Sequence, residues 1–337
     1  TAAPAGDAVP RGGRVTVPPR PLLLGTLLIA TALLAAASLL IGGGYAWSDV
    51  LTLEGDGALV LVASRVPRTL ALLLSGAGLA VSGILMQMIA RNRFVEPSTA
   101  GTVESASLGI LLTLLLMPGA PVVVRMLVAA LVALAGSALF LMLIARLPLG
   151  SVLMVPLVGI MLGGIFDAAT SFLAYRFDLL QSLGAFGSGD FSIVLRGRYE
   201  FLWIIAGLVA VAYATAARFT ILGIGEAVAV GVGLDYRRLV VFGLIIVSVV
   251  TAAAVVTVGA VPFVGLIVPN VVSLFLGDDL RRSLPVVATG GAVLVLASDV
   301  VGRIVIAPYE IPVGTIMGVV GSLGFLTLIF WRRGHAA

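Results

Sequence analysis

The sequence predicts an all-α polytopic membrane protein with about ten transmembrane helices and both termini in the cytoplasm. Of its 337 residues, 60% are hydrophobic and only 11% are charged, and the mean hydropathy is +1.20. These values exclude a soluble domain of this size. Uncharged stretches of roughly 20 residues recur along the chain, which is the length that a helix needs to cross a bilayer. The 41 glycines indicate that the helices pack closely.

Charged loops and turn residues divide the chain into ten apolar segments. The segments expected to cross the membrane are 21–41, 59–91, 102–117, 122–144, 152–175, 201–217, 239–258, 264–276, 284–306 and 313–331. All 20 basic residues are arginines, and this division places 13 of them on the side of the termini and seven on the other side. Basic residues concentrate on the cytoplasmic side of membrane proteins, so the termini are expected there.

The domain organisation follows from the same pattern. Residues 1–20 are rich in Pro, Gly and Arg and are expected to form a disordered cytoplasmic tail. Residues 21–333 form one transmembrane domain, and 334–337 form a short C-terminal tail. The polar stretch 176–199 is too hydrophilic to span and is expected outside, with a short surface helix.

Missing residue types exclude several functions. The chain has no Cys and one His, His335, close to its C-terminal end, so thiolate metal sites and Ser-His-Asp triads are excluded. Without Lys there is no P-loop, so this chain does not hydrolyse ATP by that route. We therefore expect no catalytic residue, metal or cofactor in this chain. If ATP drives its function, a partner hydrolyses it.

Four arginines lie at outer helix ends, against the charge rule: Arg65, Arg68, Arg125 and Arg303. Arg125 stands alone and is expected to reach the headgroups. Arg303 has a local partner at i, i+4 in Asp299. Two interpretations of the group stay open. The arginines pair locally, or they form a basic rim that receives carboxylates of a partner protein or an anionic ligand.

The glycine-rich stretch 221–238 is expected to be a cytoplasmic loop with short helices. Gly225, Glu226 and Ala227 begin a compact helix-turn that ends near Gly233. A single Glu in such a loop is commonly just solvated. The alternative is a short helix that fits a groove on a soluble subunit, because its Ala and Gly residues allow close contact.

Asp167 and Asp299 are the acidic residues expected deep in the membrane, where carboxylates commonly serve ion coupling. An ion-coupled secondary transporter that uses one of them is therefore the alternative to an ATP-driven transporter. An intramembrane enzyme is disfavoured, because no paired acids or hydrolase motifs are present.

Eight motifs carry a resemblance to a known family. They are RVPR (65–68), SGAGLAVSGILMQ (75–87), RNRFVEPSTAGT (91–102), GEAVAVGVGL (225–234), FVGLIVPN (263–270), GDDLRRSLP (277–285), SDVVGR (298–303) and EIPVGTIMGVVG (310–321). With these motifs, in this order, the chain resembles the FecCD-type permeases of type II ABC importers for iron-siderophores, haem and cobalamin. The resemblance covers most of residues 60–333.

The resemblance implies a ten-helix permease that pairs with a second permease subunit, identical or homologous. Two cytoplasmic ABC ATPase subunits would drive transport, and an extracytoplasmic binding protein would deliver the cargo. The family's docking arginines match Arg65, Arg68 and Arg303. Its coupling helices match about 221–238, with Gly225, Glu226, Ala227 and Gly233.

We expect the cargo pathway to be lined by the second segment together with 152–175 and 313–330. The candidate pathway residues are Gln87, Asn92, Pro269 and Asn270. Many members have R-N-P-L-A-x-P where this chain has Arg91–Pro97 as RNRFVEP, and His where it has Asn270. Both variants are similar to a subgroup for catecholate-type or mixed siderophores. They favour a ferric siderophore as cargo, at the bacterial cytoplasmic (inner) membrane.

Overall fold

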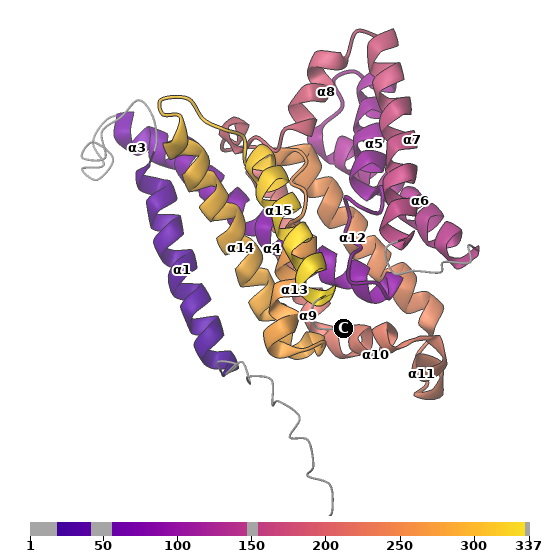
Figure 1. Ribbon diagram of the computed structural model, residues 1–337. Helices are drawn as coiled ribbons and strands as arrows, with labels where there is room; N and C mark the ends of the chain where they lie inside the picture. The colour runs from indigo at the N-terminus through magenta and orange to yellow at the C-terminus, as the bar shows by residue number, and fades with distance from the viewer. Residues whose placement is uncertain (1–18, 42–55, 147–153, 334–337) are drawn as a thin grey trace, which may run out of the picture.

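Every regular element in the described part of the chain is a helix. The computed structural model describes residues 19–41, 56–146 and 154–333 (Figure 1). The expected tails, apart from residues 19 and 20, lie outside these ranges. The elements are α1 (Arg20–Leu40), α3 (Asp56–Val60), a π-helical turn (Leu61–Arg65), α4 (Val66–Ala90), α5 (Thr102–Leu116), α6 (Val122–Arg146), α7 (Met154–Arg176), α8 (Leu180–Gly187), α9 (Trp203–Ala214), α10 (Ala216–Ile224), α11 (Glu226–Gly231), α12 (Tyr236–Val258), α13 (Val264–Leu276), α14 (Leu280–Val305) and α15 (Val313–Arg333), with 3₁₀ turns at Phe191–Ile193 and Tyr199–Leu202.

The all-α prediction is confirmed, and a helix occupies each of the ten apolar segments. Six helices in the described ranges are long and apolar enough to cross a membrane. The pair Tyr199–Ala214 and Ala216–Ile224, bent by 64°, supplies a seventh candidate. The apolar helices α5 and α13 and the part of α15 from Val313 to Thr327 are shorter. Ten crossings remain a prediction.

The sixth segment differs from the prediction at its inner end. We expected it to leave the membrane at Arg218, but the helix bends at Thr215 and continues as α10 to Ile224. The Val211 carbonyl accepts both the backbone N–H of Thr215, at 3.1 Å, and the Thr215 hydroxyl, at 2.8 Å, and such hydroxyl bonds often bend helices. Thr220 on α10 then accepts from the backbone N–H of Leu280 at 3.0 Å, tying α10 to the start of α14.

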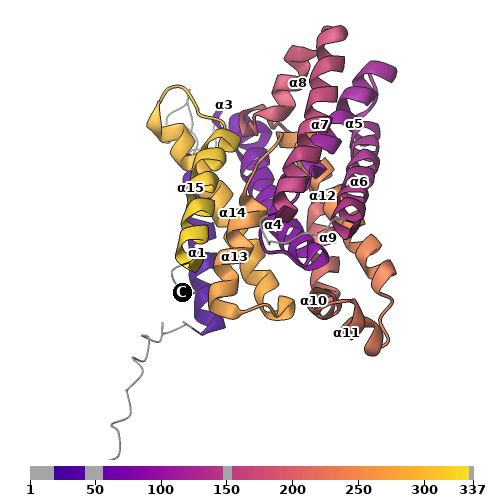
Figure 2. The same ribbon diagram turned by 45° about the vertical axis from the view of Figure 1, so that its right-hand side comes forward.

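Helix α4 lies at the centre of the bundle and packs against α14, α12 and α13 (Figures 1 and 2). Glycines make two of these contacts possible. A Cβ on Gly76 would lie 2.5 Å from the carbonyl oxygen of Gly291 in α14, and one on Gly83 would lie 2.0 Å from that of Gly265 in α13. Small residues let membrane helices approach to backbone contact, so the glycine-rich motifs of the sequence are packing surfaces.

One π-helical turn, Leu61–Arg65, joins α3 to α4 within a continuous helix. Pro67 has no N–H, so the carbonyl of Ala63 cannot receive its usual partner four residues on. It accepts instead from the backbone N–H of Arg196 at 2.9 Å. The N–H of Val66 reaches back five residues to Leu61. Arg65 therefore ends a π turn, a feature that recurs at functional sites.

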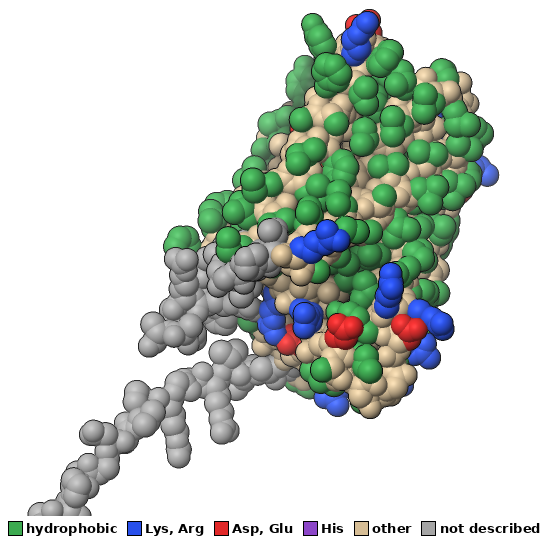
Figure 3. Space-filling model, turned by 90° about the vertical axis from the view of Figure 1, so that its right-hand side faces the viewer, with side chains coloured by type: hydrophobic (Ala, Val, Ile, Leu, Met, Phe, Trp, Pro, Cys, Tyr) green, Lys and Arg blue, Asp and Glu red, His purple; other side chains and the backbone are tan. Residues whose placement is uncertain are grey.

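The surface and the chain ends agree with a membrane protein. Figure 3 shows hydrophobic side chains covering most of one face, while charged side chains gather towards one end. The start of α1, the end of α15 and the short helix α11 all lie at one end of the bundle (Figure 1). The opposite end carries α3 and the end of α14.

Candidate functional site

The first candidate site is an arginine cluster at the end of the bundle opposite α11. Arg68 on α4 and Arg303 on α14 share the carboxylate of Asp299. The Arg68 Nη2 atom lies 2.7 Å from Asp299 Oδ1, and Arg303 Nη2 lies 2.5 Å from Oδ2. The expected pairing of Asp299 with Arg303 is confirmed. The contact with Arg68, which is 231 positions away, was not expected.

Two of the arginines bind the end of α1. Arg65 Nη1 donates to the carbonyl of Leu39 at 2.9 Å, and Arg303 Nη1 donates to those of Ser38 and Ile41 at 2.9 and 2.6 Å. The last carbonyls of a helix lack partners and carry a partial negative charge, which suits cations. The arginines thus hold α1 against α4 and α14.

The three arginines differ in how much of each is exposed to solvent. Arg65 and Arg303 are 5% and 6% exposed, so neither lies on an open rim. The side chain of Arg68 is 12% exposed, and its Nη1 atom donates to Glu310 Oε2 at 2.7 Å. Glu310 lies between α14 and α15, and sequence reasoning did not single it out. In the sequence, only the place of Glu310 in the EIPVGTIMGVVG motif pointed to this residue.

The second candidate site joins the C-terminal end of α4 to α13, and it contains the four expected pathway residues. Pro269 lies inside α13 and has no N–H for the carbonyl of Gly265. Gln87 donates its side-chain amide to that carbonyl at 3.1 Å. Asn270 donates to the carbonyls of Leu266 and Arg93, both at 2.7 Å.

Asn92 completes this junction by accepting the N–H of Phe94 at 2.9 Å. Gln87, Asn92 and Asn270 are at most 5% exposed in the single chain. These side-chain hydrogen bonds satisfy backbone groups of α13 and of the segment after α4. The structure therefore brings the four residues together as a junction between elements.

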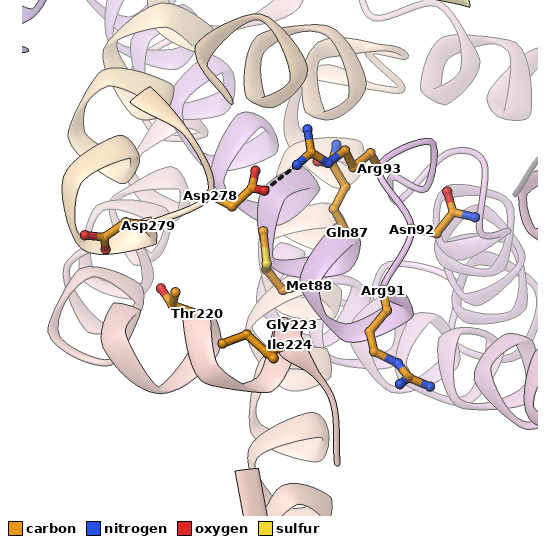
Figure 4. A pocket seen from close by; sticks show the side chains of 10 residues that line it. All are labelled: Gln87, Met88, Arg91, Asn92, Arg93, Thr220, Gly223, Ile224, Asp278 and Asp279. Carbon is orange, nitrogen blue, oxygen red and sulfur yellow. Dashed lines mark hydrogen bonds and ion pairs between the residues drawn. The ribbon is translucent and has the colours of Figure 1, made fainter. Parts of the chain in front are cut away.

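A cavity of about 560 Å³ opens beside this junction at the C-terminal end of α4 (Figure 4). Its walls are the last turn of α4, helix α10 and the turn between α13 and α14. Arg93 forms an ion pair with Asp278 across one wall, while Arg91 points away from it towards α10 (Figure 4). Arg93, which stands where many family members have Pro, thus links the segment after α4 to the α13–α14 turn.

The expectation that Asp167 and Asp299 are the deep carboxylates was incomplete. Glu96 is 2% exposed, and its Oε1 atom accepts the N–H of Phe263 at 2.8 Å at the start of α13. Phe263 is the N-cap residue, and its side chain has no hydrogen-bond acceptor with which to cap this helix. Glu104, in the first turn of α5, is half-buried. For Glu104 the available signal was the uncharged stretch that follows it, residues 105–124.

Two adjoining grooves meet beside α5. The larger lies between α5 and α7 on one side and α13 and α15 on the other, and the smaller lies between α5, the end of α8, residues 260–262 and α15. Their volumes are about 520 and 250 Å³, and both are lined by Ser98 and Glu104. Asp167 of α7 and Phe325 of α15 line the larger groove. The fifth and tenth segments therefore face a common space.

The third candidate site is α11, where the sequence predicted a helix-turn. Gly225, with φ of 137°, precedes it, and Gly233, with φ of 81°, follows it. Glu226 and Ala227 begin the helix and are exposed, and Ala229 is buried. Val228, Val230 and Val232 are 44–60% exposed, which is a large apolar surface for a six-residue helix. Figure 1 shows α11 projecting beyond α10.

A match along nearly the whole described bundle shows to which protein family the chain belongs. The family model of the FecCD transport family matches residues 24–331. The chain belongs to the FecCD transport family. Its members are permease components of ABC transporters, so the chain is a transport component and not an enzyme.

Relatives and a solved structure agree with this membership. The chain is 44% identical to the petrobactin import system permease protein YclN of Bacillus subtilis (strain 168), over 92% of this chain and 98% of the relative. It is 40% identical to the ferric-anguibactin transport system permease protein FatD of Vibrio anguillarum, over 90% and 97%. A solved inward-facing structure, assigned to the metal-chelate type of ABC transporter, matches with a TM-score of 0.77 at 26% identity, covering 93% of this chain and 99% of that one.

Proposed function

We propose that this FecCD permease is the membrane subunit of an ABC importer that carries a ferric siderophore into the cytoplasm of a bacterium. The observation that carries the proposal is the identity to the petrobactin and anguibactin permeases along nearly their whole length. The chain would cross the inner membrane ten times, with both termini in the cytoplasm. A second permease subunit, identical or homologous, two ABC ATPase subunits and a siderophore-binding protein complete the importer.

The arginine cluster is the proposed dock for the binding protein. Arg65, Arg68 and Arg303 face two carboxylates, Asp299 and Glu310, so the described cluster has one positive charge in excess. Arginine recognises carboxylates through paired hydrogen bonds, and a cationic site at the outer end attracts an acidic partner over a distance. The cluster lies at the end of the bundle opposite α11, which fits an outer dock.

Helix α11 is the proposed contact for the ATPase. Gly225, Glu226, Ala227 and Gly233 shape a short helix with exposed valines, and such a surface suits a groove on a soluble subunit. Because α10 packs against both α4 and α14, a push on α11 would be carried to the helices that hold the arginine cluster.

The two grooves beside α5 are the proposed wall of the cargo pathway, which the second permease subunit would close. The junction of Gln87, Asn92, Pro269 and Asn270 lies at the inner end of α4, where the segment after α4 meets α13. Movement of α13 against α4 at this junction would open the pathway inwards. This chain binds no cofactor in the proposal, and the ATP is used by the partner.

The test is uptake of radioactive iron as ferric petrobactin or ferric anguibactin by cells in which this chain is the only permease for that chelate. We expect uptake that stops when the ATPase is inactivated and continues when the proton gradient is collapsed. The opposite result would support an ion-coupled secondary transporter. That alternative is disfavoured, because Asp299 is fully buried between two arginines. Transport of neither chelate would contradict these two cargoes.

A further inference from the structure

The three arginines of the cluster are not equally available to a docking protein. Arg65 and Arg303 are about 95% buried and donate to the last carbonyls of α1. A carboxylate from outside would have to displace α1 to reach them. Arg68 is the one with the most exposed side chain, at 12%.

Each of the three nitrogens of the Arg68 guanidinium already donates a hydrogen bond to a carboxylate. Its Nε and Nη2 atoms donate to Asp299 Oδ1 at 3.0 and 2.7 Å, and its Nη1 atom donates to Glu310 Oε2 at 2.7 Å. Asp299 has no exposed side-chain surface, whereas the side chain of Glu310 is 32% exposed. An incoming carboxylate can therefore reach this guanidinium at the Nη1 atom, where Glu310 now lies.

Glu310 is held at this position by its neighbours. The N–H of Ile311 donates to the Gly302 carbonyl on α14 at 3.0 Å, which places Glu310 beside Arg68. Partly exposed ion pairs contribute little and are screened by salt, whereas breaking a buried pair is strongly unfavourable. Of the two carboxylates on Arg68, Glu310 is the one that exchanges.

We propose that Glu310 is an internal counter-ion of Arg68, and that a carboxylate of the docking protein displaces it. In the free permease Glu310 keeps Arg68 neutralised and oriented. On docking, the hydrogen bond from Arg68 Nη1 to Glu310 breaks, and Arg68 Nη1 donates instead to the partner's carboxylate. The Glu310 side chain then rotates to face solvent. Glu310 thereby weakens docking and makes it reversible. The inference rests on the proposed function of the cluster as a dock.

The test measures affinity between the complete transporter in lipid nanodiscs and the substrate-binding protein that restores uptake by this permease. We expect Glu310→Gln to bind about fivefold more tightly, because no ion pair has to be exchanged. Arg68→Gln should bind at least about tenfold more weakly. Glu200→Gln is the matched control, because Glu200 accepts from the backbone of Gly197 and touches no arginine side chain in the described structure. Its affinity should stay unchanged.

A second variant shows whether the contact of Glu310 with Arg68, rather than its negative charge alone, weakens docking. Glu310→Asp keeps the negative charge but is one methylene shorter, so it should bind about as tightly as Glu310→Gln. Wild-type affinity for both Glu310 variants, with weakened binding of Arg68→Gln, would overturn the internal counter-ion while leaving the dock intact. Unchanged affinity of Arg68→Gln would overturn the dock itself. Equal tightening by Glu200→Gln and Glu310→Gln would assign the effect to net charge and also overturn the proposal.

Discussion

Gln87 and Pro269 are complementary across the contact between α4 and α13. The proline leaves the carbonyl of Gly265 without an intrahelical partner, and the amide of Gln87 donates to that carbonyl at 3.1 Å. Within a bilayer no water is available to take this role. A proline inside a short helix is therefore tolerated because a neighbouring helix supplies the missing donor.

This relationship predicts that Gln87→Leu is destabilising by about 1–3 kcal/mol, because a buried carbonyl loses its partner. In the Pro269→Ala background residue 269 regains an N–H for Gly265, so adding Gln87→Leu should cost clearly less. The measurement is the thermal unfolding midpoint of the four proteins in detergent. Equal destabilisation by Gln87→Leu in both backgrounds would show that the two residues act independently.

The close approach of α4 to α13 at Gly83 gives a second prediction. Gly83→Ala would place a Cβ 2.0 Å from the carbonyl oxygen of Gly265, so α4 and α13 would have to separate. We expect a loss of about 1–3 kcal/mol and reduced uptake, because overpacking moves backbones. Gly207→Ala on α9 is the control, since nothing lies within 4 Å of its new Cβ. Wild-type unfolding of Gly83→Ala would contradict the contact.

Much of this architecture could be predicted from the sequence, because long apolar segments and charged loops are local properties. The helices, the helix-turn at Gly225–Gly233 and the Asp299–Arg303 pair are all found where the pattern placed them. The bend at Thr215 was missed, because a hydroxyl in an apolar helix does not by itself predict a break.

What could not be predicted depends on contacts between distant segments. Arg68 and Asp299 are 231 positions apart, and neither residue's own helix indicates the other. The charge pattern left open whether the arginines pair locally or form an outer rim, and it gave no sign that the end of α1 covers two of them. Glu96 was missed as a buried group, because its donor is the start of α13.

Asp299 gives a third prediction, which concerns stability. Asp299→Asn would leave two buried guanidinium groups without their shared counter-charge, and breaking a buried ion pair costs about 3–5 kcal/mol. We expect a large fall in the unfolding midpoint and poor recovery of the complex. Asp278→Asn is the matched control, because the Asp278 side chain is 52% exposed in its pair with Arg93. Similar midpoints for the two variants would mean that the buried network contributes little.

The last prediction separates coupling from folding at α11. Gly225 has φ of 137°, a backbone conformation that residues other than glycine rarely adopt. Gly225→Val must therefore change the direction in which α11 leaves α10. Because α11 contributes one buried residue, Ala229, the rest of the bundle should keep its unfolding midpoint. We expect ATP-driven uptake to fall at least about tenfold while affinity for the binding protein is unchanged. Gly231→Ala, in the same helix with open space around its Cβ, should transport normally. Normal uptake by Gly225→Val would rule out α11 as the element through which the ATPase acts.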